Sequence, residues 1–486
     1  MMSLLFRRCL TALLFCGGAA LAQADDGALR PCHPAGMVSA VLCGSIERPL
    51  NPADAAGPRI RIHYAVAPSK ARQKQPNPLY FLAGGPGQSA IELMPRVLGA
   101  FDRINNRRDI VFVDQRGTGQ SAPLVCDDDA RLPLAEALDA DRQIERLVAC
   151  RTKLQKLPHG DLRFYTTTLA MHDLDAVRAA LGHERINLFG ASYGTRAALE
   201  YLRLYPQRVR RAVIDGVAPP DMALPVALAE DAQAALNRHF ELCEKDADCA
   251  RRYPQVRQQW RQVLASMPRE VQLEHPLTGA RERLTLTRTM LLGMARGPLY
   301  QPGRASALPP AIAAASEGRF GALLGLAAMD GAGKMKMAMG MHYSVVCAED
   351  MRAAAPVGAT GDFAGFAEAN YRRICAEWPR GTVDPAFYAI PPAPAPVLLL
   401  SGGLDPATPP RHGERVARAL GEKARHVVAA HEGHGVFAGA CFGGVLKNFL
   451  AATNDAEALR VDTACLQRAP APKVFVPLEA LMREAK

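Results

Sequence analysis

A serine between two glycines is the residue of this chain best suited to act as a nucleophile. Ser192 lies in the pentapeptide Gly-Ala-Ser-Tyr-Gly at residues 190–194. The apolar stretch 186–189 before it is rich in strand formers, and the apolar spacing over 197–204 predicts a helix after it. A tight strand–turn–helix would expose the hydroxyl, and glycines let the two elements approach closely. A chance match in a loop is the alternative, but the flanking elements favour a nucleophilic serine.

An acid and a histidine follow at two later points where buried strands are expected to end. Asp405 comes after the apolar stretch 396–401, and His434, between two glycines, comes after the stretch 424–430. A buried carboxylate can orient a histidine, which then takes the proton of a serine hydroxyl. We therefore expect Ser192, Asp405 and His434 to form a catalytic triad.

Two other residues could replace members of this triad. Asp215 lies at the end of the expected strand 209–217 and is a rival acid, and His431 is the fallback base. The spacing between His431 and His434 is one residue shorter than in the His-Glu-x-x-His zinc motif, so the two rings would not share a helix face. We expect neither a metal nor another cofactor.

Backbone N–H groups on two loops are expected to stabilise the oxyanion that forms during acyl transfer. One is the N–H of Tyr193, at the start of the helix after the serine. The glycine-rich loop 84–89, which follows the short apolar strand 79–83, supplies the other, because only glycine lets the backbone approach a carbonyl closely. We expect Gly85 to be this donor, with Gly84 as the alternative. A phosphate-binding loop is disfavoured because no Gly-Lys-Ser/Thr follows.

The order serine, acid, histidine and the alternation of strands with helices are typical of the α/β-hydrolase fold. We expect a mostly parallel central sheet formed by two parts of the chain, residues 25–218 and 391–486. In residues 219–390 the pattern changes to Ala-rich helices separated by Pro and Gly, which predicts an inserted helical lid. Residues 25–58 are expected to be irregular, and 59–66 to form an edge strand.

The first 24 residues have the pattern of a secretory signal peptide. Arg7 and Arg8 precede an apolar run over 9–18, and small residues suited to cleavage follow up to residue 24. The apolar run is too short to span a membrane. We therefore expect a protein exported to the periplasm or the medium, without stable membrane insertion.

Cysteine usage is consistent with export. The chain has 12 cysteines, of which Cys9 and Cys16 lie in the signal segment, and the others are neighbours along the sequence. In an oxidising compartment such neighbours predict local disulfides, although spacing alone does not determine the connectivity. The preferred pairing is sequential: Cys32 with Cys43, Cys126 with Cys150, Cys243 with Cys249, Cys347 with Cys375, and Cys441 with Cys465.

Other conspicuous residues are expected to be structural. The net charge of +10 is dispersed, so nucleic-acid binding is not indicated. The alternating methionines of 335–341 could bind Cu(I), but adaptable apolar packing is the preferred interpretation. Arg116 is expected to pair with a nearby carboxylate in the turn after the strand at 109–114. Asp173 and Asp175 are expected to be solvated acids in the first turn of a helix.

With these motifs the chain resembles the α/β-hydrolase peptidases of the proline iminopeptidase and tripeptidyl aminopeptidase group. The matching segments are Gly84–Gly87, Asp114–Ser121, Gly190–Gly194 and Gly403–Pro406. The segment around His434 also looks like the tripeptidyl-aminopeptidase type. Ala83 stands where proline iminopeptidases usually carry histidine, which favours the tripeptidyl-aminopeptidase-like branch.

The resemblance implies an aminopeptidase in which acidic lid residues bind the free N-terminus of a small peptide. The segment 346–350 looks like the corresponding family segment, so Glu349 is the candidate, with Asp350 behind it; solvated acids near a disulfide are the alternative. The expected activity is release of N-terminal residues or short peptides through an acyl-enzyme. A carboxylic-ester or lactone hydrolase with the same triad, and a non-catalytic binding protein on a hydrolase shell, are the competing hypotheses.

Overall fold

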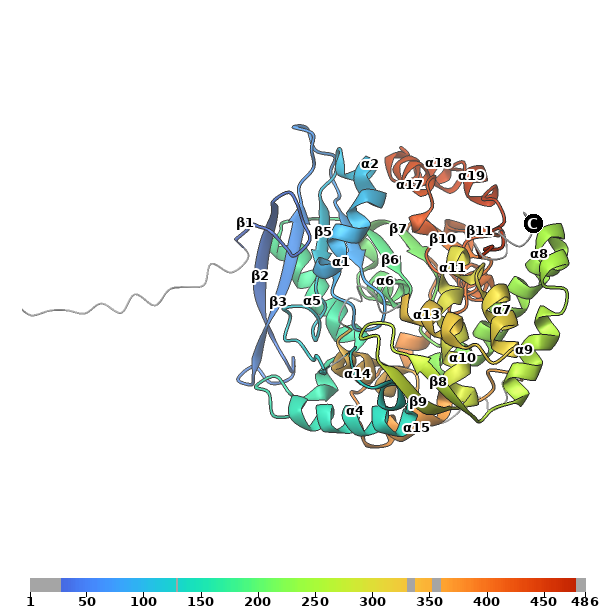
Figure 1. The fold of residues 1–486 in the computed structure, drawn as a ribbon. Coiled ribbons are helices and arrows are strands. Elements are labelled where there is room, and N and C mark those ends of the chain that lie inside the picture. Colours follow the sequence, from blue (N-terminus) through green and yellow to red (C-terminus); the bar gives the residue numbers. More distant parts are fainter. Residues whose placement is uncertain (1–27, 128–129, 330–336, 352–359, 478–486) are drawn as a thin grey trace, which may run out of the picture.

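The computed structural model describes residues 28–127, 130–329, 337–351 and 360–477, and a nine-stranded mixed sheet forms its centre (Figure 1). The strand order is β1-β2-β3-β5-β4-β6-β7-β10-β11. Pairing is antiparallel from β1 to β5 and parallel from β5 to β11. The strands are β1 (Arg30–Cys32), β2 (Val41–Pro49), β3 (Arg59–Ala67), β4 (Leu79–Leu82), β5 (Ile110–Val113), β6 (Ile186–Ala191), β7 (Val209–Asp215), β10 (Val397–Gly402) and β11 (Ala424–Ala429). The predicted α/β fold with a mostly parallel sheet is confirmed.

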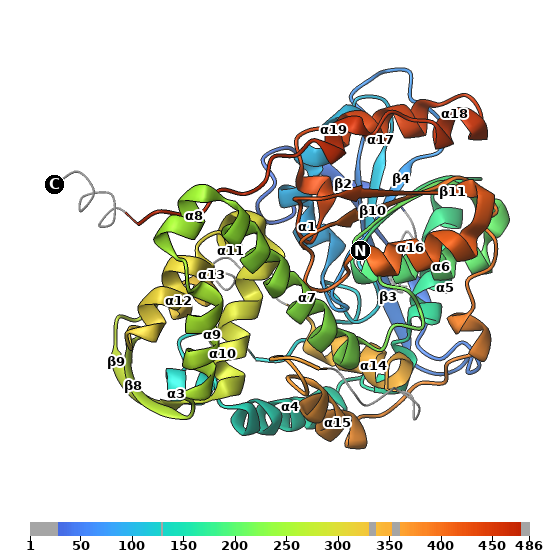
Figure 2. The ribbon, with the colours of Figure 1, turned by 90° about the vertical axis from the view of Figure 1, so that its right-hand side faces the viewer.

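Helices cover both faces of the parallel strands, which explains why β4, β5, β6 and β10 are almost uninterrupted apolar runs. One face packs against α5 (Thr167–Ala180), α6 (Tyr193–Leu204) and α16 (Pro410–Leu420). The other face packs against α1 (Ala90–Val97), α2 (Asp102–Asn105) and α17 (Phe442–Ala451), and the short helices α18 (Asp455–Leu459) and α19 (Ala464–Gln467) follow there (Figure 2). Because these strands run parallel, the loops that follow them emerge together at one edge of the sheet.

The expectation of an irregular segment over 25–58 was wrong. Strand β2 pairs with β3 along its whole length, from Leu42 opposite Val66 to Pro49 opposite Arg59. Consequently β3 is an interior strand between β2 and β5 rather than an edge strand. The short polar and glycine-containing sequence of β2 has little intrinsic strand signal, and its conformation depends on pairing with β3.

Residues 219–390, called the inserted segment below, connect β7 to β10 and lie beside the sheet (Figure 2). They have an apolar core of their own around Trp260. Their elements are α7 (Leu224–Lys245), α8 (Ala247–Arg252), α9 (Val256–Ala265), β8 (Arg269–Glu274), β9 (Arg281–Leu286), α10 (Arg288–Arg296), the 3-10 helix η4 (Gly297–Tyr300), α11 (Pro302–Ala305), α12 (Leu308–Ser316), α13 (Gly321–Met329), α14 (Met339–Glu349) and α15 (Glu368–Glu377). The antiparallel hairpin β8–β9 was not expected from the sequence.

Two further parts of the chain pack against the inserted segment. Helices α3 (Leu134–Ala137) and α4 (Ala140–Leu154) come between β5 and β6, yet the N–H of Leu134 donates to Glu282 of β9. At the other end of the chain, the N–H of Phe475 donates to the carbonyl of Ser306. The layer beside the sheet is therefore formed by more of the chain than the insertion alone.

The turn after β5 contains a buried ion pair. Arg116 donates through Nε and Nη2 to the two carboxylate oxygens of Asp173, at 2.7 and 2.9 Å. The structural role expected for Arg116 is confirmed. The expectation for Asp173 was wrong, because α5 begins at Thr167, which places Asp173 in the second turn at 1% exposure. Asp175 is not a free acid either, since it accepts from Arg178 and Tyr201.

Five disulfides join the cysteines in the predicted sequential pairing. Each closes a loop within a single region of the fold, and Cys347–Cys375 joins α14 to α15 in the inserted segment. The expected signal peptide lies outside the described residues. Within the described part of the chain, no helix is long and apolar enough to cross a membrane.

Candidate active site

Ser192 lies on a sharp turn between β6 and α6. Its backbone has φ 56°, a value in the left-handed region that side chains larger than hydrogen rarely adopt, and its N–H donates to the carbonyl of Asp215 at 2.9 Å. A Cβ on Gly190 would lie 2.3 Å from the carbonyl oxygen of Gly194, and one on Gly194 would lie 2.1 Å from that of Leu82. Both glycines are therefore required by close backbone contacts, and the strained serine is held by its surroundings.

His434 and Asp405 are joined by a hydrogen bond of 2.8 Å between Nδ1 and Oδ2. The Asp405 carboxylate, whose side chain is 0% exposed, also accepts from the N–H of Ala407 and from the N–H and hydroxyl of Thr408. Burial alone would raise the pKa of Asp405, but the charge of His434 and these hydrogen bonds outweigh it and lower the pKa. An ionised carboxylate only accepts, so Nδ1 of His434 carries a hydrogen and Nε2 is left to accept a proton.

The charge around His434 favours its protonated form. Burial lowers the pKa of His434, but the charge and hydrogen bond of Asp405, together with the charge of Asp215, raise it above its ordinary value. A Cβ on Gly216 would lie 3.3 Å from Cε1 of His434, and the preceding carbonyl, that of Asp215, accepts from Ser192. The end of β7 thus touches both the serine and the histidine, from two adjacent residues.

The rival residues have other partners. The carboxylate of Asp215 accepts from the N–H groups of Val436 and Phe437, at 3.1 and 2.7 Å, and so holds the loop that carries His434 rather than the ring itself. Burial raises the pKa of Asp215 to about 7. Nδ1 of His431 is bonded to the carbonyl of Ala469 at 2.8 Å. The partner of the His434 ring is Asp405.

The glycine-rich loop lies directly against the serine. A Cβ on Gly84 would lie 3.2 Å from Cβ of Ser192, and Gly85 has φ +112°, which favours glycine. Ser89 at the end of the loop caps α1 and donates its hydroxyl to Asp114 at 2.6 Å. The loop is therefore anchored at Ser89, while its glycines lie next to the Ser192 side chain.

The inserted segment also holds this loop, through a histidine that sequence reasoning missed. The N–H of Ala338 donates to the carbonyl of Gly87 at 2.9 Å, and Nδ1 of His342 lies 3.1 Å from the carbonyl of Pro86. Nε2 of His342 lies 2.9 Å from the hydroxyl of Tyr371. Because a carbonyl only accepts, Nδ1 donates and Nε2 accepts, and burial lowers the pKa of this neutral histidine to about 4. Only the methionine-rich pattern marked this stretch in the sequence.

Glu349 and Asp350 are buried, at 1% and 2% exposure, which contradicts the alternative of solvated acids. Arg196 of α6 pairs through Nη1 with Asp350 at 2.8 Å and with Glu349 at 3.5 Å. Glu349 also accepts from the N–H and hydroxyl of Thr167, and burial raises its pKa to about 7. The Thr167 hydroxyl is bonded in turn to the hydroxyl of Tyr193, so this cluster lies behind the first turn of α6.

The described part of the methionine-rich stretch packs against two loops of the fold, and Met337 lies beside Gly87 of the glycine-rich loop. Met341 is 1% exposed and packs against Gly117, which is core packing, while residues 330–336 of the methionine-rich stretch lie outside the described residues. Among the residues that the structure describes, no three His, Cys, Asp or Glu side chains are grouped so as to hold a metal ion.

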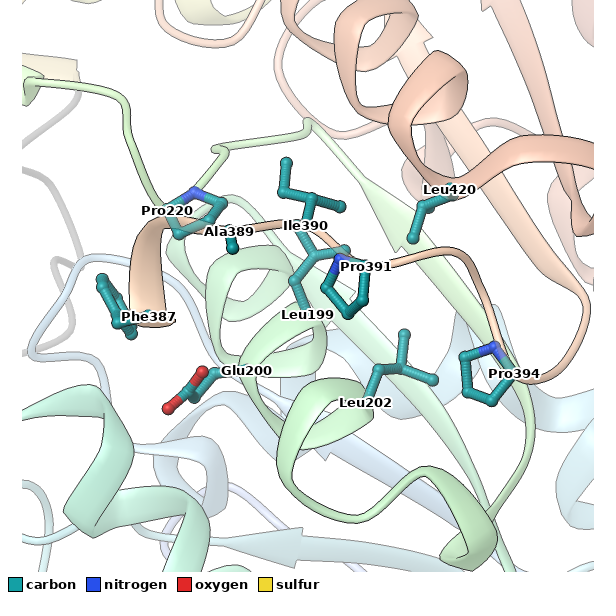
Figure 3. Close-up of a pocket in the computed structure, with 10 residues that line it drawn as sticks. All are labelled: Leu199, Glu200, Leu202, Pro220, Phe387, Ala389, Ile390, Pro391, Pro394 and Leu420. Atoms are coloured by element: carbon teal, nitrogen blue, oxygen red, sulfur yellow. The ribbon is translucent and has the colours of Figure 1, made fainter. Parts of the chain in front are cut away.

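An apolar pocket lies on the outer side of α6, two turns further along the helix than Ser192 (Figure 3). It is lined by Leu199 and Leu202 of α6, by Leu420 and by the segment 387–394, with Glu200 at its edge. The oxygens of Glu200 are already bonded to Thr168 and Arg203. The lining includes none of the residues described above, so this pocket is separate from the candidate site.

Comparison with known proteins agrees with the fold. A family model described as alpha/beta hydrolase fold matches residues 77–439, from just before β4 to just beyond His434. The chain therefore belongs to the α/β-hydrolase fold family. Within that family it is a serine hydrolase, and its relatives bear names of serine peptidases.

The serine protease Hip1 of Mycobacterium tuberculosis is 28% identical over 377 residues, which cover 69% of this chain and 71% of that protein. A tripeptidyl aminopeptidase of Streptomyces lividans is 32% identical over 197 residues, covering 37% of this chain and 36% of the relative. Among solved structures, a proline iminopeptidase of Mycobacterium smegmatis is 18% identical, with a TM-score of 0.39 over 84% of this chain and 97% of that chain. The resemblance to the peptidases of this fold is confirmed by the two relatives found by sequence, the serine protease and the tripeptidyl aminopeptidase.

Proposed function

We propose that this chain is an exported serine aminopeptidase that releases N-terminal residues or short peptides from small peptide substrates. The observation that carries the proposal is the hydrogen bond between Nδ1 of His434 and the buried Asp405 carboxylate, next to a serine held at φ 56°. The tripeptidyl aminopeptidase and proline iminopeptidase names of relatives support peptide bonds as the target.

In the proposed reaction, Oγ of Ser192 attacks the scissile carbonyl while Nε2 of His434 takes its proton. Asp405 keeps the imidazole in the required tautomer and stabilises the imidazolium. The N–H groups of Tyr193 and Gly85, or of Gly84 in place of Gly85, stabilise the oxyanion. His434 then protonates the leaving amine, and water hydrolyses the acyl-enzyme by the same path in reverse.

An aminopeptidase also needs negative charge for the substrate ammonium. In the cluster behind α6, the carboxylates of Glu349 and Asp350 both face the guanidinium of Arg196. Because both acids are buried, we propose that they attract the ammonium through their negative charge rather than by direct contact. Glu349→Gln removes one of these carboxylates and is expected to raise KM for peptides with a free N-terminus.

Export is proposed from two observations. The first 24 residues have a signal-peptide pattern, and five disulfides lie in the part of the chain that follows. Disulfides persist in oxidising compartments, which for this chain means the periplasm or the medium.

A matched pair of peptides tests the proposal, one with a free N-terminus and one acetylated, beside a simple nitrophenyl ester, with Ser192→Ala as the blank. We expect the wild-type protein to cleave the free peptide and to leave the acetylated one intact. Glu349→Gln should act on the same peptide with a raised KM. Equal cleavage of both peptides would exclude an aminopeptidase but leave a serine peptidase.

An esterase that acts on carboxylic or lactone esters is the second candidate. It is favoured by one observation, the burial of Glu349 and Asp350 against Arg196, because an ester substrate needs no ammonium recognition. Turnover of the nitrophenyl ester with both peptides untouched would establish this alternative.

A further inference from the structure

The inserted segment places an arginine next to the candidate catalytic histidine. Tyr300 of η4 touches His434 twice: its carbonyl accepts from the His434 N–H at 3.0 Å, and its ring lies edge-on to the imidazole at 5.2 Å between centroids. Arg296, in the last turn of α10, donates through Nη2 to the Tyr300 hydroxyl at 2.6 Å, and its guanidinium carbon lies 5.1 Å from the centre of the same ring. One aromatic ring therefore separates the guanidinium from the imidazole.

Arg296 differs from the other arginines close to the site in having no counter-ion. Arg116 pairs with Asp173 and Arg196 with Asp350, but Arg296 has no carboxylate partner within residues 28–127, 130–329, 337–351 and 360–477. Its Nε is buried without an acceptor, while the side chain as a whole is partly exposed. A partly buried cation without a counter-ion is unfavourable, and a bound anion would relieve it.

The position of Arg296 indicates which part of a substrate would meet it. His434 must protonate the leaving amine, so groups packed beside its ring border the leaving side of the scissile bond. The positive charge of Arg296 opposes the rise in pKa of His434 and that of Tyr371, the residue bonded to His342 behind the glycine-rich loop. The charge of the guanidinium therefore acts on the His434 side and on the Tyr371 side of the site.

We propose that Arg296 binds a carboxylate of the substrate on the leaving side of the scissile bond. The preferred substrates are then short peptides whose C-terminal carboxylate, or an acidic side chain in the leaving part, reaches this guanidinium. This inference rests on the proposed function insofar as the substrate is a peptide. The hydrogen bond that Nη2 donates to the Tyr300 hydroxyl orients the guanidinium and leaves Nη1 for the substrate.

The test uses alanine peptides of increasing length with a free N-terminus, each as the C-terminal acid and as the C-terminal amide. A second series carries one glutamate at successive positions of the amide peptides, which distinguishes a terminal carboxylate from a side-chain carboxylate. We expect the wild-type protein to prefer an acid over its amide in kcat/KM by about tenfold to a hundredfold at the length that reaches Arg296. If a side chain is the source, the glutamate series shows this preference instead.

Variants at the two ends of α10, at Arg296 and at Arg288, test whether the preference for the acid depends on Arg296. Arg296→Gln should lower kcat/KM for the acid more than for the amide, so that the two become equal, and Arg296→Lys should retain part of the preference. Arg288→Gln is the matched control: Arg288 begins the same helix, is 46% exposed and pairs with Asp362, so its loss should leave the preference intact. Thermal melts establish that each variant is folded, and Arg296→Lys serves if Arg296→Gln is not.

Equal kcat/KM for acid and amide at every length, with no glutamate preference, would overturn the proposal, as would a preference that survives Arg296→Gln. Failure of the proposed function gives a different result, which is ester turnover without peptide cleavage. In that case competitive inhibition of nitrophenyl ester hydrolysis by trialanine and by trialanine amide decides. Tighter inhibition by the acid, lost in Arg296→Gln, supports the carboxylate site, and equal inhibition rejects it.

Discussion

Two buried pairs of opposite charge in this protein have similar carboxylates and different cations. Asp173 and Asp405 are both nearly inaccessible, with side chains 1% and 0% exposed. Arg116 is equally buried, and all three of its guanidinium nitrogens are bonded to Asp173 or to backbone carbonyls. His434 is 17% exposed and uses only Nδ1 on its acid.

The difference separates a structural pair from a pair suited to proton transfer. A cation with every donor satisfied inside the protein fixes the position of the elements that meet there. A histidine with one nitrogen bound to a carboxylate and the other available can exchange a proton with a substrate. The burial and charge of the two acids do not distinguish the pairs, whereas the number of uncommitted nitrogen atoms on the cation does.

The largest effect is expected from Asp405→Asn. Asparagine keeps the shape but favours the wrong tautomer of His434, and the loss of such an acid lowers kcat by about ten-thousandfold. The melting temperature should change little by comparison with kcat. Steady-state kinetics and thermal melts measure both, with Ser192→Ala as the blank. Near-normal kcat in Asp405→Asn would show that the pair of Asp405 and His434 has only a structural role, like the pair of Asp173 and Arg116.

Asp173→Asn is expected to have the opposite effect to Asp405→Asn, with a loss of stability and an unchanged kcat. It leaves the Arg116 charge buried without a counter-ion, which costs about 3–5 kcal/mol in the free energy of unfolding. Denaturant unfolding measures this loss, and kcat per folded molecule should be unchanged. Asp161→Asn is the control, because it breaks an ion pair with Arg163 that is exposed to solvent. A selective loss of kcat in Asp173→Asn would contradict the distinction between a structural pair and a pair suited to proton transfer.

His342 tests the comparison from a third position, because both of its nitrogens are bonded but one of them holds the glycine-rich loop. In His342→Asn the side-chain amide can replace Nδ1 and donate to Pro86, whereas in His342→Gln it can replace Nε2 at Tyr371. If the loop contact positions the oxyanion donor, His342→Gln should have a kcat about tenfold below that of His342→Asn, with a similar KM.

A matched loss of melting temperature in His342→Asn and His342→Gln, with no difference in kcat, would instead make His342 a purely structural residue.

The smallest expected effect is a shift of the pH profile. His434 must be neutral to accept a proton, and its pKa is raised above the ordinary value of 6.5 by Asp405. The acidic limb of kcat/KM should therefore lie above that pH, with activity lost as the pH falls through the raised pKa. In the residual activity of Asp405→Asn the limb should move to lower pH. A limb at the same pH in both proteins would show that another group titrates.

The sequence alone determined the features that depend on neighbouring residues. The two glycines around Ser192 mark a turn that needs small residues, and the apolar runs of β4, β5, β6 and β10 mark strands covered on both faces. The sequential disulfides could also be predicted, since short loops bring their cysteines together. These signals are local, although for the disulfides the spacing favoured the sequential pairing without determining it.

The tertiary structure decided the contacts between residues far apart in the chain. The burial of Asp173 depends on Arg116, the conformation of β2 depends on its pairing with β3, and His342 meets a loop 256 residues away. Arg296 reaches His434 only because η4 packs against the loop after β11. Whether a polar side chain is solvated, paired or left with an uncommitted atom depends on which distant elements pack against it. Those packing contacts are set by how the whole chain folds around its core.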